Sequence, residues 1–199
     1  MKIVLVGVNG AIGQAVQRHL GERHTIIGAS RTNAELKIDM TDSQSIRSAF
    51  ESVGNFDALI VAAGAVAFNT FPAMTDDEWQ LGLDSKLMGQ VKLAQIALDY
   101  LNPHGSITLT SGVTSKESIA MGASSSMANS ALESFVRAAS TELPNHLRMN
   151  IVNPTVLEES VGQYGEYFLG FEPVSSTSVG YAYQRSVEGV ENGRTYEVF

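Results

Sequence analysis

Short β-branched runs alternate with longer segments of helical period from one end of the chain to the other. The first run, KIVLVGV at 2–8, is apolar almost throughout, as expected for a strand that is buried on both faces. A segment of helical period follows at 11–21 and ends near a glycine. By the same pattern, strands are predicted at 24–30, 57–64, 106–112, 148–154 and 194–199, and helices at 43–54, 75–101, 128–143 and 179–190. This alternation is typical of an α/β fold in which helices cover both faces of a parallel sheet.

The longest predicted helix is expected to run without interruption over 75–101. It begins with a Thr-x-x-Glu capping box at 75–78, and Leu83 and Leu93 fall near one face. The sequence Asn-Pro-His-Gly at 102–105 then predicts a turn before the next strand.

The composition favours one domain. Of the 199 residues, 44% are apolar and 17% are charged, which is enough apolar material for one sizeable core, so residues 1–199 are predicted to form a single domain. We find neither a leader-type apolar segment at the N-terminus nor an apolar run of about 18 to 20 residues. We therefore expect no contact with a membrane and a cytoplasmic location.

The charge balance narrows the range of partners. With 21 acidic and 13 basic residues the formal net charge is −8, which disfavours binding to the phosphate backbone of nucleic acids. The chain contains no cysteine, and its four histidines are far apart without the spacing of metal ligands, so neither thiol chemistry nor a metal site is expected. A small molecule remains the expected partner.

Glycines mark the first strand-to-helix turn, in the sequence GVNGAIG at 7–13. They stand where a strand turns sharply into a helix, whose free N–H groups can bind a pyrophosphate. Because the turn is the first of an alternating chain, it predicts a dinucleotide site. The predicted contacts there are Gly7, Asn9, Gly10, Ala11, Ile12 and Gly13.

The end of the second strand indicates which dinucleotide is bound. A cofactor without a 2′-phosphate usually meets an acidic residue about 20 positions after the glycines. Here the strand ends in Ser30, Arg31 and Thr32, with no acid before Glu35. A guanidinium can bind a phosphate with two hydrogen bonds, whereas a carboxylate would repel it. The sequence therefore favours NADP(H), and the alternative is that Arg31 is only a solvated turn residue.

Taken together, these features resemble the short-chain dehydrogenase/reductase family over essentially the whole chain. The glycine spacing is similar to that of its extended and atypical members, AAG at 62–64 resembles its NAG motif, and EWQLGLDSKLMGQ resembles its helix that starts with tryptophan. The resemblance implies a single Rossmann-type, doubly wound parallel sheet with helices on both faces. It also implies further cofactor contacts at Asp39, Met40, Ala62, Ala63, Gly64, Pro154 and Val156.

The family's catalytic residues are replaced. Counting along the matching segments, its asparagine falls on Lys86, its serine on Gly112 beside Ser111, and its Tyr-x-x-x-Lys pair on Ser125 and Asn129. In the family the tyrosine delivers a proton to the carbonyl oxygen, and an aliphatic hydroxyl is too weak an acid to replace it. Asn129 can still bind ribose hydroxyls, because an amide has both donors and an acceptor.

Lys86, Ser111 and Ser125 are the candidate catalytic residues. The period of its helix lets the Lys86 ammonium point inward, and a lysine that reaches solvent fits the pattern equally well. Tyr164 and Tyr167 lie in a short segment expected to cap the substrate, where each either reaches the pocket or packs within the cap.

Two functions are consistent with these residues. The first is an atypical NADPH-dependent reductase that transfers a hydride to a small activated carbonyl or quinone-like acceptor, whose product needs no strong acid. The alternative is a catalytically silent sensor that binds NADP(H) without turnover. Family members commonly pair through the helices that match 76–101 and 124–143, so the resemblance also implies a homodimer.

Overall fold

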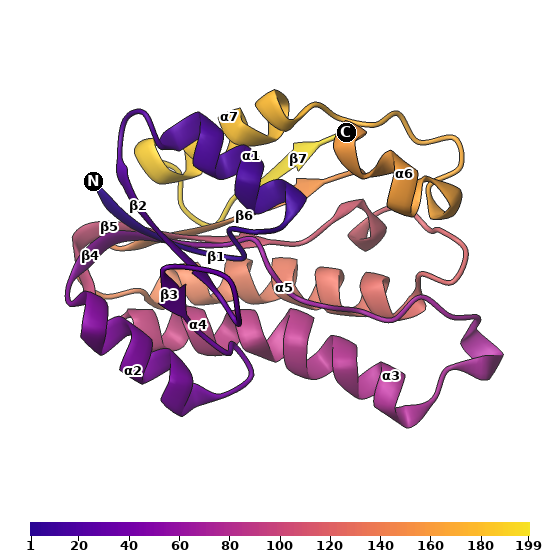
Figure 1. Ribbon diagram of the computed structural model, residues 1–199, viewed down its shortest axis with the longest axis horizontal. Coiled ribbons are helices and arrows are strands. Elements are labelled where there is room, and N and C mark those ends of the chain that lie inside the picture. The colour runs from indigo at the N-terminus through magenta and orange to yellow at the C-terminus, as the bar shows by residue number, and fades with distance from the viewer.

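The computed structural model describes residues 1–199, and its centre is a parallel sheet with the strand order β3-β2-β1-β4-β5-β6-β7 (Figure 1). Within the sheet β1 pairs with β2 on one side and with β4 on the other. The chain thus builds one half of the sheet and then returns to build the second half, which confirms the doubly wound sheet. The strands are β1 (Lys2–Val6), β2 (Thr25–Ser30), β3 (Leu36–Lys37), β4 (Phe56–Val61), β5 (Leu101–Thr110), β6 (Arg148–Pro154) and β7 (Thr195–Val198).

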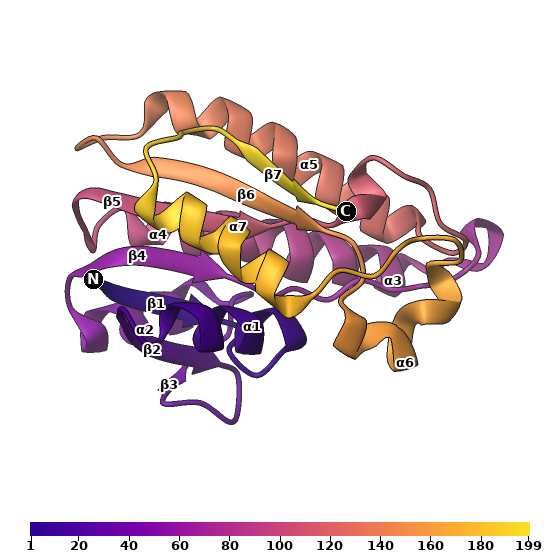
Figure 2. The same cartoon turned by 90° about the horizontal axis from the view of Figure 1, so that it is seen from above.

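Helices cover both faces of this sheet (Figures 1 and 2). On one face α1 (Ala11–Leu20) packs against α7 (Ser176–Glu188), and a cluster of 14 buried residues lies beneath the two helices. The opposite face carries α2 (Ser43–Val53), α4 (Gln90–Ala97) and α5 (Ala123–Ala139) over a cluster of 22 buried residues. Burial on both faces explains why the central strands read as continuous apolar runs.

The helix predicted over 75–101 is not continuous. It begins with α3 (Asp76–Leu81), and the predicted capping box of Thr75 and Glu78 is present. A π-helical segment at Gly82–Gly89 follows, and only then does α4 begin. The apolar spacing of the sequence did not reveal the change from α-helical to π-helical hydrogen bonding over Gly82–Gly89.

The segment 102–105, predicted as a turn, lies within β5 instead. The pairing of β5 with β4 shifts its register between Phe56 and Ala58, and His104 has a φ of 65°. The residues that suggested a turn therefore form an irregularity inside the strand. β5 ends at Thr110, so Ser111 and Gly112 leave the sheet where the predicted strand would have continued.

The cap is short and helical. It contains α6 (Val161–Tyr164), which lies beyond the carboxyl ends of the strands (Figure 2). No helix in the molecule combines the length and the apolarity that crossing a membrane would require.

Candidate cofactor and substrate site

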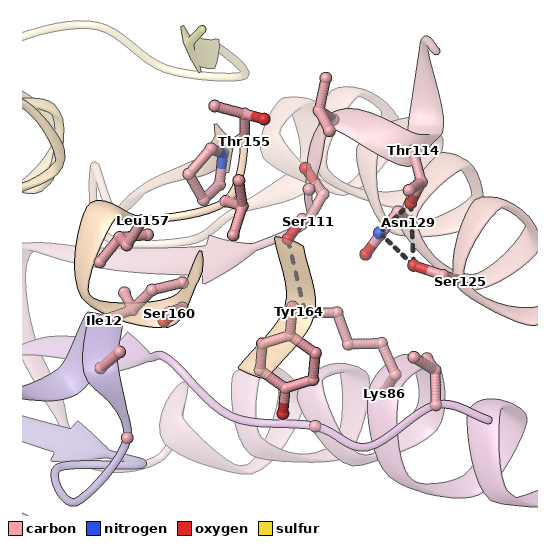
Figure 3. A pocket seen from close by; sticks show the side chains of 18 of the residues that line it. Ile12, Lys86, Ser111, Thr114, Ser125, Asn129, Thr155, Leu157, Ser160 and Tyr164 are labelled. Carbon is pink, nitrogen blue, oxygen red and sulfur yellow. Dashed lines mark hydrogen bonds between the residues drawn. The ribbon is translucent and has the colours of Figure 1, made fainter. Parts of the chain in front are cut away.

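A cavity of about 460 Å³ opens at the carboxyl ends of the central strands (Figure 3). Its walls come from the start of α1, the loop after β4, the π-helical segment, α5 and α6. The crevice lies where the sheet reverses its strand order, which is the usual ligand site of an open α/β sheet.

Two different causes explain the glycines of the first turn, namely packing within the protein and space for a ligand. Gly7 has a φ of 92°, and a Cβ there would lie 2.3 Å from the carbonyl oxygen of Ala62. At Gly13 a Cβ would lie 2.0 Å from the Gly7 carbonyl oxygen, so both residues are fixed by packing. At Gly10 a Cβ would meet only the Gly7 carbonyl oxygen, at an ordinary 3.5 Å. Close approach of a ligand phosphate explains a glycine at this position, whereas packing does not.

The N-terminus of α1 is free to bind an anion. Its N-cap is Gly10, and no side chain accepts the first N–H groups of the helix. Together with the helix dipole, these donors favour a phosphate at this end of the cavity. Asn9 was predicted as a cofactor contact. Its side-chain amide instead donates to Ser30 Oγ at 3.0 Å and to the Asn33 carbonyl at 2.7 Å. It holds the loop after β2 against the glycine turn.

The loop after β2 presents an unpaired guanidinium. Arg31 and Thr32 are exposed, and Arg31 has no ion-pair partner in the protein. Hydrogen bonds from the Thr41 hydroxyl and backbone N–H hold the pKa of Asp39 below its usual range, and the Arg31 charge adds to this. Asp39 is thus a fixed, ionised acceptor beside the loop. The Met40 side chain, by contrast, packs against Gly89.

The positions predicted for the family's tyrosine and lysine carry neutral groups. Ser125 and Asn129 are buried on the face of α5 that borders the cavity. Asn129 Nδ2 donates to Thr114 Oγ1 at 2.8 Å and to Ser125 Oγ at 3.2 Å, and the two hydroxyls are 2.8 Å apart (Figure 3). None of these side chains titrates near neutral pH, so this wall of the cavity offers no acid.

The predicted catalytic role of Ser111 finds no support in the direction of its hydroxyl. Ser111 Oγ donates to Glu133 at 3.0 Å, behind the cavity. The neighbouring Gly112 faces the site, and a Cβ there would lie 3.1 Å from Asn129 Nδ2. A serine at position 112 would crowd this amide, so the glycine and Asn129 suit one another.

Glu133, which sequence reasoning missed, is a buried carboxylate on α5. Its Oε1 accepts hydrogen bonds from Ser111 Oγ at 3.0 Å, from Ser115 Oγ at 2.6 Å and from Asn153 Nδ2 at 2.7 Å. Lys116 Nζ lies 3.3 Å from Oε2. The carboxylate therefore ties α5 to the chain after β5 and to the end of β6. An acid on the buried face of the helix, one turn after the predicted ribose contact, was the available signal.

Lys86 points into the cavity, as the inward alternative predicted (Figure 3). Its stem crosses Gly64, which has a φ of 124° and where a Cβ would lie 2.8 Å from Lys86 Cα and Cδ. Its Nζ donates to the Ser111 carbonyl at 3.5 Å. Burial lowers the pKa of Lys86 to about 8. It is the only charged side chain that lines the cavity.

Gln90 fixes the π-helical segment that carries Lys86. The side chain of Gln90 is fully buried and donates to the Lys86 carbonyl at 3.2 Å. The same amide donates to the Thr110 carbonyl at 2.8 Å and accepts from the Thr110 N–H at 2.9 Å. These bonds join the segment to the end of β5. A π-helical turn inside a longer helix is frequent at functional sites.

One of the two cap tyrosines reaches the cavity. Tyr164 and Phe168 line it, together with Phe68 from the loop after β4. Tyr167 instead stacks on Phe68, with ring centroids 4.8 Å apart.

Two buried acceptors fit the groups of a nicotinamide dinucleotide. Asn129 Oδ1 and Thr155 Oγ1 lie in residues that line the cavity, and neither atom has a hydrogen-bond partner within the protein. Buried polar atoms are rarely left unpaired, and a ribose and a carboxamide would supply the missing donors. Of the predicted cofactor contacts, those that line the cavity are Gly10, Ala11, Ile12, Ala62, Gly64, Asn129, Pro154 and Val156.

Comparison with known proteins identifies the family. A family model described as enoyl-(acyl carrier protein) reductase matches residues 2–175. The chain belongs to the short-chain dehydrogenase/reductase family. As a member of this family, the chain is an NAD(P)(H)-dependent oxidoreductase.

Individual proteins are similar to this chain over most of their length. L-xylulose reductase of Homo sapiens is 25% identical over 182 residues, which cover 81% of this chain and 74% of that protein. The crystal structure of lin1944 from Listeria innocua is 38% identical, with a TM-score of 0.98 and 100% of both chains covered. A small-chain dehydrogenase in complex with NADPH is 25% identical, with a TM-score of 0.88, and 100% of this chain and 96% of that one are covered.

Proposed function

We propose that the chain is an NADPH-dependent reductase of small activated carbonyl compounds or quinones. The observation that carries this proposal is the contrast within one cavity. Groups that suit a nucleotide are present, whereas Ser125 and Asn129 replace the proton-donating pair. Tyr164 does not restore it, because its hydroxyl points away from Ser125 and Asn129 (Figure 3).

In this proposal, four groups of the chain each bind one part of NADPH. The free N–H groups of α1 hold the pyrophosphate, and Arg31 binds the 2′-phosphate of NADPH with its unpaired guanidinium. Asn129 Oδ1 accepts from a ribose hydroxyl, and Thr155 Oγ1 bonds the carboxamide. Bound NADPH supplies the hydride. The NADPH complex of a 25% identical relative supports this choice over NADH.

The acceptor proposal follows from the missing tyrosine. Hydride addition to a plain ketone leaves an alkoxide, which needs a positioned acid or donor while the charge develops. In a quinone or a dicarbonyl the negative charge spreads over a conjugated system, and water can protonate the product afterwards. Such acceptors need mainly proximity and orientation, which a cavity lined by Phe68, Tyr164 and Phe168 offers.

Oxidation of NADPH by the pure protein tests this proposal. We expect turnover with quinones and activated dicarbonyls, and negligible rates with unactivated ketones and alcohols. Titration of NADPH and NADH in the same preparation tests the cofactor choice separately. Binding of NADPH without turnover of any acceptor would support a silent sensor and contradict the proposal.

A further inference from the structure

The Lys86 ammonium has no anionic partner within the protein. None of the ion pairs of the molecule involves it, and its protein acceptor is a neutral carbonyl, that of Ser111, at 3.5 Å. Every other residue that lines the cavity is apolar or carries a neutral polar group. A partly buried cation without a counter-ion costs free energy, so an anion that enters the cavity gains strongly from pairing with it.

The Lys86 side chain enters the cavity from the side away from the N-terminus of α1, where the phosphate is expected. The Lys86 side chain comes from the side of Ser125 and Asn129 and reaches toward Ser111 in the middle of the view, whereas Ile12 at the start of α1 lies on the opposite side (Figure 3). The contact with Gly64 holds the lysine stem, so the charge is positioned in advance.

We propose that this end of the cavity binds a carbonyl substrate that also carries a carboxylate, such as an α-keto acid. The carboxylate forms an ion pair with Lys86. The inference rests on the proposed function, since an α-keto acid is itself an activated carbonyl. The carboxylate pairs with Nζ, and the same positive charge stabilises the neighbouring carbonyl oxygen as it becomes negative. The aromatic side chains of the cap then contact the remainder of the substrate.

A matched pair of probes tests the charge requirement on the wild-type protein. Phenylglyoxylate and its methyl ester share one keto group and differ in the negative charge. Their binding is measured by calorimetry on protein saturated with NADP⁺, where no hydride can be transferred. We expect the acid to bind at least about tenfold more tightly than the ester.

Two lysine variants assign the effect to one residue. Lys86→Met should remove the preference for the acid. Lys92→Met removes the same charge from α4, outside the cavity, where Nζ donates to the Thr41 carbonyl, and should leave the preference unchanged. Thermal unfolding of both variants shows whether they are folded.

The pH dependence of binding provides a second readout. The pKa of Lys86 is lowered to about 8 by burial, so the ammonium is present below that pH and is lost above it. Affinity for the acid should fall as the pH rises through 8, while that for the ester stays constant. Other titratable groups on the neighbouring elements are Tyr164 on α6, Glu133 behind Ser111, the exposed Asp84, and Asp76, Asp77 and Glu78 on α3. The ester controls for their effects.

Three results would overturn the inference. They are equal affinities for acid and ester, a preference that survives Lys86→Met, and a Lys86→Met variant that loses affinity for NADP⁺ alone. Reduction of neutral quinones by NADPH would still stand in each case, so failure of the inference is distinguishable from failure of the proposed function.

Discussion

The two ends of the cavity differ in which part of the chain forms them. At the α1 end the proposed binding groups belong to the backbone, namely the glycine turn and the free N–H groups of the helix. At the α5 end the site consists of side chains, and Lys86, Ser125 and Asn129 stand where the resemblance predicts the family's catalytic residues. Backbone binding depends on turn geometry, which the fold preserves, whereas side-chain chemistry changes with single substitutions. A nucleotide site can therefore persist while the reaction beside it changes.

Substitution of alanine for Gly7 or Gly10 should separate the effects on stability and on cofactor binding at the α1 end. The loss of stability in Gly7→Ala is the largest effect that we expect. Gly7→Ala forces a Cβ into the Ala62 carbonyl at a positive φ and should lower the free energy of unfolding by about 3 kcal/mol or more. Gly10→Ala has room within the protein and should leave the melting temperature unchanged, while NADPH affinity falls at least about tenfold. Calorimetric melting and cofactor titration measure both. Intact NADPH binding by Gly10→Ala would show that no phosphate approaches this residue.

Removal of the Glu133 carboxylate should destabilise the α5 end. Glu133→Ala leaves Ser111, Ser115 and Asn153 without their acceptor, and should lower the free energy of unfolding by about 3 kcal/mol. Denaturant unfolding measures this. The exposed Glu142 is the control, since Glu142→Ala removes the same charge and should change stability little. Equal stability of the two variants would mean that the buried carboxylate does not anchor α5.

The same contrast explains how much the sequence revealed. The strands and the glycine turn were predictable because continuous burial and a sharp turn leave strong local patterns. The inward direction of Lys86 remained open, because it depends on Gly64, whose contact comes from a distant loop. The π-helical segment was missed since its stabilisation by Gln90 requires the end of β5, a tertiary contact.

At the α5 end, hydroxyl directions were beyond sequence reasoning. Ser111 was predicted as a candidate catalytic residue from its place beside Gly112. Its hydroxyl donates to Glu133 instead, and that carboxylate lies on a different element. A family motif assigns a position to a residue type, and the partner that orients the side chain is found only in the folded chain.

Arg31 tests whether the α1 end distinguishes the two nicotinamide cofactors. Arg31→Ala removes a charged phosphate partner, so NADPH affinity should fall about tenfold while NADH affinity stays the same. Fluorescence titration of both cofactors measures the change. Arg47→Ala, which removes an exposed arginine on α2, is the control and should affect neither. Equal affinity of the wild-type protein for both cofactors would contradict the prediction.

Formation of a homodimer is expected to have the smallest effect on the two ends of the cavity. A homodimer through α3, α4 and α5 remains a prediction, and the partly exposed Leu81, Met88 and Met127 support it. Light scattering should give twice the monomer mass, and Leu81→Lys should shift the equilibrium toward the monomer. A monomer mass that is independent of concentration would refute the dimer.

The central claim is that the cavity binds NADPH and an acceptor but lacks a proton donor at the position of the family's tyrosine, which Ser125 occupies. The most direct test compares biacetyl with butanone, because the two acceptors have the same carbon chain and differ in the second, activating carbonyl. We predict a kcat/KM for NADPH-dependent reduction at least about a hundredfold higher for biacetyl. Reduction of butanone within about tenfold of biacetyl would mean that another group, such as the Lys86 ammonium, acts as the acid and would contradict the claim, and turnover of neither would contradict the proposed reductase.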